Sequence, residues 1–154
     1  MKLGLRGISD PYVIGTYQDV SDNKKEFDRK VRTVLRGMTV YFMNIEFLNP
    51  LRYGLFSYQF FCHKLLRWLV PLFLLLALIT NLLLVNAAGI FILLLLGQSV
   101  FYALAFCGWR RTEPPSKVLL KIPLYFITVN VSILVAWWRY LSGNRMVMWI
   151  PSER

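Results

Sequence analysis

Three long stretches without a charged side chain limit what this chain can fold into. They cover residues 68–85, 87–107 and 122–138. A helix of about 20 residues crosses a hydrocarbon layer of ~30 Å, so each stretch spans or nearly spans a bilayer. The alternative, a soluble domain with three buried core helices, needs more amphipathic covering sequence than 154 residues supply. We therefore predict an all-α integral membrane protein with transmembrane helices at about 68–86, 87–107 and 118–138.

Basic side chains are distributed unevenly around these stretches. Eleven of the 18 Lys and Arg residues precede the first stretch, four lie within residues 110–121, and the turn at 85–89 holds none. Loops rich in Lys and Arg stay on the cytoplasmic side, so we expect a cytoplasmic N-terminus and an external turn. With three spans the C-terminal tail, 142–154, would end outside, although the three arginines after residue 138 favour the opposite side.

Residues 23–67 are expected to form two amphipathic helices at the membrane surface. In the first, Asn23 followed by Glu26 is typical of a capped helix start. Apolar residues then recur at helical spacing on one side, and basic residues recur on the other. The apolar set is Phe27, Val31, Val34, Leu35, Met38, Phe42 and Ile45, and the basic set is Lys25, Arg29, Arg32 and Arg36. This pattern predicts a helix that lies in the headgroup plane.

The aromatic-rich stretch 53–68 predicts the second surface helix, after a break at Asn49-Pro50. Its junction with the first span is marked by His63, Lys64 and Arg67. Pro71 would then lie in the first turn of that span, where its missing N–H costs little. The preceding lead, residues 1–22, reads as an extended, turn-rich segment.

Few residues could carry catalysis. His63 is the only histidine, Cys62 and Cys107 are the only cysteines, and no Asp-x-Asp pair or glycine-rich phosphate loop is present. The most polar side chains within the first two spans, Asn81 and Gln98, are expected to hydrogen-bond between helices. The small polar groups of the third span could also bond across helices; they are Thr128, Asn130 and Ser132. We predict no catalytic residue and no metal site in this chain.

The basic stripe at residues 25–36 allows three interpretations. The first is attraction to anionic headgroups, to which each Lys or Arg contributes about 1 kcal/mol near the surface. The second, nucleic-acid binding, is disfavoured because the stripe adjoins membrane spans and lacks exposed stacking aromatics. The third is a diphosphate clamp, since the planar guanidinium donates two parallel hydrogen bonds to phosphate. Its candidate residues are Arg29, Arg32 and Arg36.

Four stretches follow one another in a recognisable order. They are EFDRKVRTVLRGM at 26–38, LNPLRYG at 48–54, HKLLRWLVP at 63–71 and MWIPSER at 148–154. This order resembles the C-terminal membrane region of family-two membrane glycosyltransferases, inverting enzymes that make extracellular polysaccharides or lipid-linked sugars from nucleotide sugars. In that family a helix after the catalytic base carries a Gln-x-x-Arg-Trp motif or a looser basic variant.

The match to that motif is partial. Arg32 matches its arginine, whereas Arg29 replaces the glutamine and Thr33 replaces the tryptophan. The resemblance therefore implies that Arg32 contacts the donor diphosphate, but the acceptor-binding role of the tryptophan does not carry over. In such enzymes the nucleotide-sugar fold, its Asp-x-Asp motif with a divalent Mg or Mn ion, and the catalytic aspartate lie upstream. Residues 1–22 resemble the stretch that follows the catalytic acid.

We accordingly expect a membrane-anchoring and donor/acceptor-gating module for polysaccharide or lipid-linked sugar synthesis that is inactive as an isolated chain. Its implied partners are membrane lipid, a catalytic glycosyltransferase domain or subunit, and a nucleotide sugar bound through that partner, with no nucleic acid. The alternative is a non-enzymatic membrane adaptor or scaffold subunit that recruits a partner to anionic membrane. A small transporter is disfavoured because the spans lack charged or broken-helix features.

Overall fold

The computed structural model describes residues 12, 23–111 and 117–146. The expected extended lead, apart from Tyr12, and the MWIPSER stretch lie outside the described residues. Within the described part, every regular element is a helix. Three of these helices are long and apolar enough to cross a membrane. For the described residues, the prediction of an all-α fold with three helices of membrane-spanning length is thereby confirmed.

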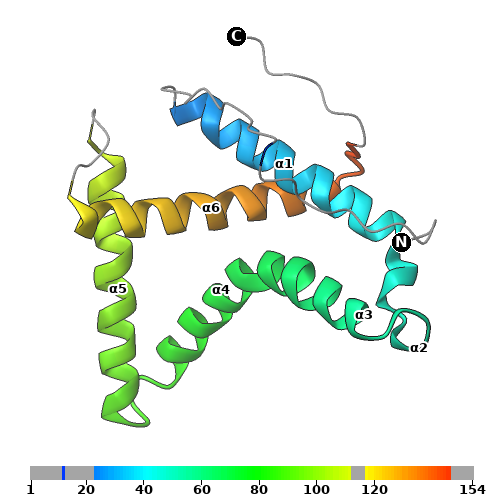
Figure 1. Cartoon of the computed structure of the whole chain (residues 1–154). Helices are drawn as coiled ribbons and strands as arrows, with labels where there is room; N and C mark the ends of the chain where they lie inside the picture. Colours follow the sequence, from blue (N-terminus) through cyan, green and yellow to red (C-terminus); the bar gives the residue numbers. More distant parts are fainter. Residues whose placement is uncertain (1–11, 13–22, 112–116, 147–154) are drawn as a thin grey trace.

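The helices follow the chain in a simple order (Figure 1). Helix α1 spans Asn23–Met43 and leads through a 3-10 turn, η1 (Ile45–Leu48), into the short α2 (Pro50–Tyr53). Next come α3 (Leu55–Phe60), a wider π-type turn, η2 (Phe61–Leu66), and α4 (Arg67–Leu83). The last two helices are α5 (Gly89–Trp109) and α6 (Val118–Leu141).

Helices α3 and α4 form one helical run, Leu55–Leu83, in place of a separate surface helix and span. The run bends between the two labels in Figure 1. Two features in this part bend helices: the wide turn η2 and Pro71, which removes one backbone hydrogen bond. Pro71 is buried inside the helix, so its expected place in a first turn is wrong. The basic residues of the predicted junction fall at the bend, in η2 and at the first residue of α4.

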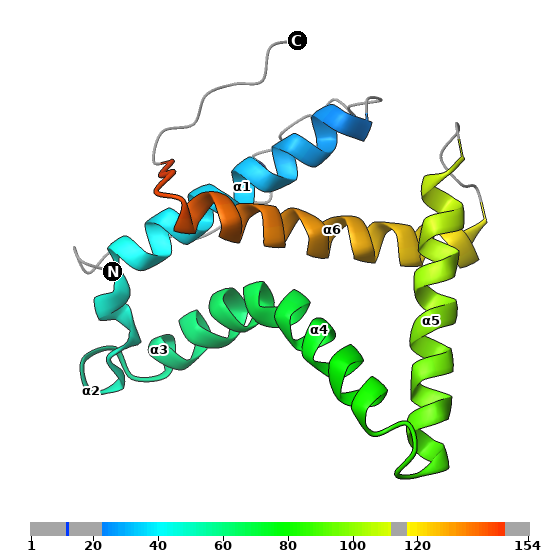
Figure 2. The same ribbon diagram turned by 180° about the vertical axis from the view of Figure 1, so that it is seen from behind.

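Helices α4, α5 and α6 outline a triangle (Figures 1 and 2). α4 and α5 diverge from the turn at residues 84–88, and α6 crosses from the far end of α5 to the beginning of α4. Asn81 on α4 and Gln98 on α5 share a hydrogen bond of 3.4 Å, and Gln98 also donates to the Leu74 carbonyl of α4 at 3.3 Å. The prediction that Asn81 and Gln98 hydrogen-bond between helices is thereby confirmed.

The small polar groups of α6 behave differently from the expectation. Thr128, Asn130 and Ser132 each donate to a carbonyl three or four residues earlier in α6. These bonds are local because a hydroxyl or amide in a helix reaches the carbonyl of the preceding turn without help from a neighbour. The predicted bonds across helices are not formed by these donors.

The main core lies between α1, α6 and the bend of the α3–α4 run. Its buried members are Val31, Leu35, Met38 and Tyr41 of α1, Trp68 of α4, and Ile133 and Ala136 of α6. The predicted apolar side of α1 is thus the packed side, except that Ile45 lies beyond the helix in η1 and is exposed. The apolar side of α1 packs against α6 instead of lying on an open surface. This side of α1 is therefore not free to insert into lipid, because α6 covers it. The position of α1 in the headgroup plane stays a prediction.

Candidate functional site: the basic side of α1

The three predicted phosphate-binding residues lie on one side of α1, which we call the arginine face (Arg29, Arg32 and Arg36). At 3.6 residues per turn they fall within an arc of about 60°. The buried Val31 and Met38 lie roughly opposite, and the buried Leu35 lies about 60° from Arg32. Arg36 is exposed, whereas Arg29 and Arg32 are half-buried. Helical register therefore points Arg36 away from the core and leaves Arg29 and Arg32 at its edge.

The opposite side of α1 is anchored by aromatic packing. The Tyr41 ring stacks on Phe60 at 4.3 Å and meets the Trp68 ring edge-on at 5.4 Å. Trp68 also reaches Gly37, where an added Cβ would lie 3.1 Å from the Trp68 ring atom Cζ2. Glycine at this position lets the indole approach the helix backbone. The arginine face consequently sits on a helix held by both α4 and α6.

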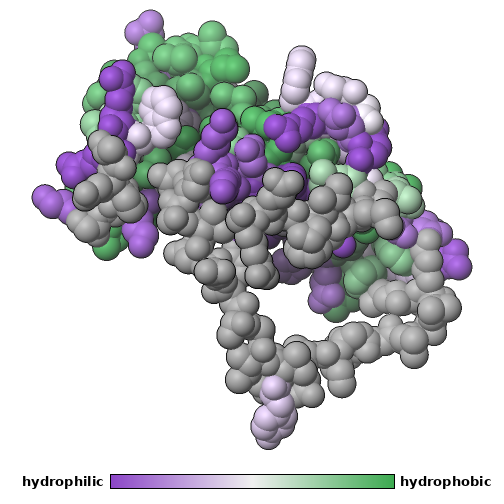
Figure 3. All heavy atoms as spheres, turned by 90° about the horizontal axis from the view of Figure 1, so that it is seen from above, coloured by the Kyte–Doolittle hydropathy of each residue, from purple (hydrophilic) through white to green (hydrophobic). Residues whose placement is uncertain are grey.

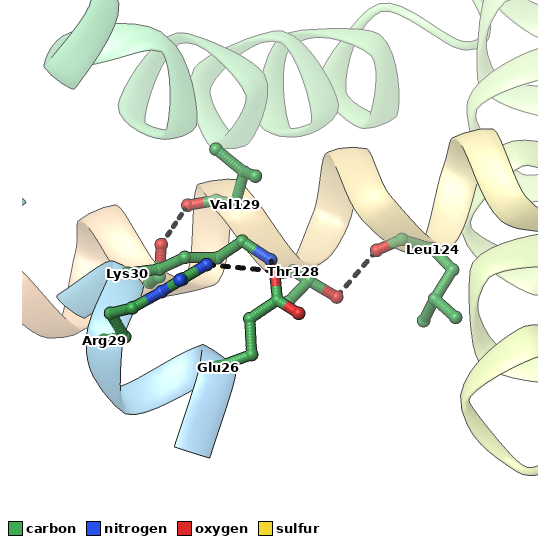
Figure 4. Close-up of polar contacts among 7 residues, drawn as sticks. Glu26, Arg29, Lys30, Leu124, Thr128 and Val129 are labelled. Carbon is green, nitrogen blue, oxygen red and sulfur yellow. Dashed lines mark hydrogen bonds and ion pairs between the residues drawn. The ribbon is translucent and has the colours of Figure 1, made fainter. Parts of the chain in front are cut away.

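One arginine of the face is already engaged in an ion pair. In Figure 4, Arg29 and Lys30 both approach the carboxylate of Glu26. The Lys30 Nζ donates to Glu26 Oε1 at 2.7 Å, and the Arg29 Nη2 lies 3.8 Å from the same oxygen. Within the described residues, Arg32 and Arg36 form no ion pair. These two are therefore better placed than Arg29 to meet an external anion.

Lys30 links α1 to α6. Its ammonium lies 5.0 Å from the centre of the Tyr125 ring, a cation–π contact. Its bond with Glu26 follows the favourable order of Glu four residues before Lys, which the sequence spacing could have predicted. The contact with Tyr125 could not have been predicted, because the two residues are far apart in the chain. Lys30 thus belongs to the helix–helix contact and not to the arginine face.

Seen from above, hydrophilic side chains lie beside and between hydrophobic ones on the described surface (Figure 3). Guanidinium groups gathered on one helix side can bind phosphate oxygens through charge-assisted hydrogen bonds. Among the described residues, no group of three or more His, Cys, Asp or Glu side chains could hold a metal ion. The arginine face is therefore suited to bind an anion.

Two buried polar atoms have no hydrogen-bond partner in the described part of the chain. They are the Tyr41 hydroxyl and the Asn130 Oδ1. Burial raises the pKa of the Tyr41 phenol, because removal from water disfavours the charged phenolate. Helical spacing places Tyr41 beside the apolar side of α1, but no pattern in the sequence indicates that its hydroxyl is enclosed. Burial of these two atoms without a partner costs folding free energy, and neither atom belongs to a charged site.

No family model, curated protein or solved structure matches the chain. The resemblance to family-two glycosyltransferases remains a prediction that rests on the sequence stretches and the arginine spacing.

Proposed function

We propose that this chain is the membrane module of a family-two-like glycosyltransferase, integral to the membrane with a cytoplasmic N-terminus. In this proposal the arginine face of α1 binds the diphosphate of a nucleotide sugar. A separate catalytic domain or subunit supplies the nucleotide-sugar fold, the catalytic aspartate and the Mg or Mn ion. The observation that carries the proposal is the division of α1 into a covered apolar side and an outward arginine side.

That division favours a phosphate site over simple lipid anchoring by α1. A surface-binding amphipathic helix needs a free apolar side to bury in the headgroup and acyl boundary. On α1 this side includes Val31 and Met38, whose side chains are fully enclosed by the rest of the chain. The helix is already fixed, so its arginines are preorganised and lose less freedom when they bind an anion.

The apolar helices would hold this site at the membrane surface. Most large side chains along α4 and α5 are exposed, and the described chain covers few of them. Contiguous apolar surface of this extent is stable in hydrocarbon and not in water. Anchored in this way, the module would bring the donor diphosphate to a lipid-linked or growing acceptor, and the isolated chain would transfer no sugar.

The test replaces the chromosomal copy of the gene by one that encodes the Arg32→Gln variant, and it measures sugar transfer by isolated membranes. Radiolabelled UDP- and GDP-sugars serve as donors, and label in lipid and polymer is counted. A lost charge-assisted bond costs about 1.5–3 kcal/mol, so we expect transfer to fall by about 10- to 100-fold. The matched control is Arg111→Gln, which removes an exposed arginine beyond α5 and should leave transfer unchanged.

Unchanged transfer by Arg32→Gln, with normal amounts of the chain in the membrane, would refute the phosphate role. Transfer by the purified chain alone would refute the proposal of a separate catalytic partner. Cross-linking in native membranes supplies a second measurement. The partner that it captures should carry a nucleotide-sugar fold with an Asp-x-Asp motif.

A membrane adaptor is the second candidate, and one observation favours it. Leu51 and Leu55 are 97% and 71% exposed and flank the exposed Arg52, a combination suited to a protein partner or to lipid. In this alternative Arg32→Gln and Arg111→Gln have equal, modest effects on binding to phosphatidylglycerol vesicles. Replacing Leu51 by Ser would then weaken partner capture without any change in sugar transfer.

A further inference from the structure

The ends of α4 and α5 define one side of the membrane. The two helices form a V whose closed end is the turn at residues 84–88, which has no charged side chain (Figures 1 and 2). At the open end, α4 begins with Arg67 and α5 ends at Trp109, directly before Arg110 and Arg111. When α4 and α5 cross a bilayer, these basic ends lie at the same surface.

Helix α6 reaches from one of these ends to the other. At its beginning, an added Cβ on Gly108 of α5 would lie 3.3 Å from both the Leu120 carbonyl oxygen and the Leu124 Cβ, so the two helices touch closely. Near its end, the Trp137 indole Nε1 donates to the Trp68 carbonyl of α4 at 2.9 Å. Both ends of α6 are therefore tied to the open end of the V. A helix that begins and ends at one surface does not cross to the other.

Helix α1 runs along α6 in the same direction. Lys30 meets the Tyr125 ring near the start of both helices, and the Phe42 ring lies 5.1 Å from the Tyr140 ring near their ends. A helix that carries the arginine face cannot lie in the hydrocarbon, because a charged side chain there is costly. Since α6 stays beside α1 over most of its length, it too belongs at the surface.

Charges around α6 agree with this placement. Lys117 and Lys121 lie at its beginning, Arg139 in its last turn and Arg145 just after it. A third span would carry Arg139 and Arg145 to the outside, against the tendency of basic residues to remain in the cytoplasm. Arg145 lies over the Tyr140 ring at 3.7 Å, close to the surface shared with α1. If both ends of α6 lie at the cytoplasmic surface, Arg139 and Arg145 remain in the cytoplasm and this conflict does not arise.

We propose that only α4 and α5 cross the bilayer, whereas α6 lies in the surface of the membrane beneath α1. Both ends of the described chain are then on one side, and the acyl–headgroup boundary is the partner of α6. The side of α6 turned away from Ile133 exposes Val131 and Trp138, at 41% and 74%. Lipid covers this side and α1 covers the other, which explains why a helix lying in the surface is apolar on both. This placement does not depend on any glycosyltransferase activity.

The first test locates the C-terminus of the full chain. Green fluorescent protein, which fluoresces in the cytosol, and alkaline phosphatase, which is active only after export, are each fused after Arg154 and inserted at Asn86. We expect fluorescence without phosphatase activity after Arg154, and phosphatase activity at Asn86. Active phosphatase with no fluorescence after Arg154 would overturn the placement of α6.

The second test measures depth along α6 in vesicles of phosphatidylcholine and phosphatidylglycerol. Spin labels are attached at Val131→Cys and Trp138→Cys, one at a time, after Cys62 and Cys107 are replaced by Ser. Collision rates with oxygen and with a water-soluble nickel complex then report depth. A helix in the surface gives both positions equal depth, whereas a perpendicular span separates them by about 10 Å.

The matched control uses two exposed positions of α5 with the same separation, Leu93→Cys and Val100→Cys. These should differ in depth by about 10 Å, because α5 is a span. Circular dichroism checks that each variant keeps its helix content. A difference along α6 as large as that along α5 would overturn the proposal, whatever the fusion reporters show.

Discussion

Helices α5 and α6 are alike in composition and unlike in surroundings. Both are long and apolar enough to cross a membrane, at 21 and 24 residues. Yet only 6% of the apolar window of α5 is buried within the chain, against 22% for α6, whose one side is covered by α1. Apolar length allows a helix to lie in hydrocarbon, whereas the helices packed against it determine its orientation relative to the membrane.

The largest expected effect tests the packing of α1 on α6, which distinguishes α6 from α5. Met38 is fully buried between α1 and its neighbours, so Met38→Ala should destabilise the fold by about 2–5 kcal/mol through the cavity it leaves. Met43, at the end of the same helix, is 66% exposed, and Met43→Ala should change stability by less than about 0.5 kcal/mol. Denaturant unfolding in detergent micelles measures both. Equal effects would mean that α1 does not pack on α6.

The next effect compares a charge in the middle of each helix. Leu96→Lys places a cation at the centre of α5, and its insertion should cost about 3 kcal/mol. Val131→Lys places the same charge on the exposed side of α6. If that side lies at the headgroup boundary, the cost should be about 1 kcal/mol or less, since the ammonium can reach water. A membrane-insertion assay gives both values, and equal costs would place the two helices at the same depth.

A smaller effect tests the tie between α6 and α4. Trp137→Phe removes the hydrogen bond to the Trp68 carbonyl and should lower stability by about 1 kcal/mol, since a typical bond contributes 0.5–1.5 kcal/mol net. Trp138→Phe is the control, because Trp138 is exposed and makes no such bond within the described residues. Thermal unfolding in micelles is the measurement. A loss in the control as large as in Trp137→Phe would contradict the structural role of this bond.

The smallest effect concerns the enclosed hydroxyl of Tyr41. Because this hydroxyl has no partner in the described part of the chain, Tyr41→Phe should be neutral or stabilising by up to about 1 kcal/mol near pH 7. The pKa of Tyr41 is raised above 10.0 in the fold, so the unfolded chain ionises first as the pH increases. Wild-type stability should therefore fall above pH 10.

The phenylalanine variant lacks this ionisation and should lose less stability over the same alkaline range. Unfolding in micelles at pH 8 and above pH 10 compares the two proteins. An identical decline in both would show that Tyr41 is hydrated in the folded state.

Several features could be predicted because they depend on local spacing. The helical periodicity of α1 placed Val31, Leu35 and Met38 on one side, and the structure buries all three. The absence of charge predicted the apolar helices, and Asn81 and Gln98 were each expected to hydrogen-bond to a neighbouring helix. The arginine face follows from the same periodicity, so its existence as a surface needed no tertiary information.

Other features depended on contacts between distant parts of the chain. The sequence separated a surface helix from a span near residue 68, whereas the structure continues one bent helix through this point. The bend allows Trp68 to meet Gly37 and Trp137, partners on two other helices. No local pattern specifies such a meeting, because it requires three segments to approach in space.

The sequence by itself determined that this protein is helical, that three of its helices suit hydrocarbon and that α1 has an apolar and a basic side. These properties follow from hydropathy and helical register, which are local. Only the tertiary structure decided what covers the apolar side and where α6 runs. Val31 and Met38 are fully buried in the core that α1 shares with α4 and α6, and the Trp137–Trp68 bond fixes the far end of α6 beside the start of α4. Because the apolar side of α1 faces this core, the arginines lie on the part of the helix that the core does not cover.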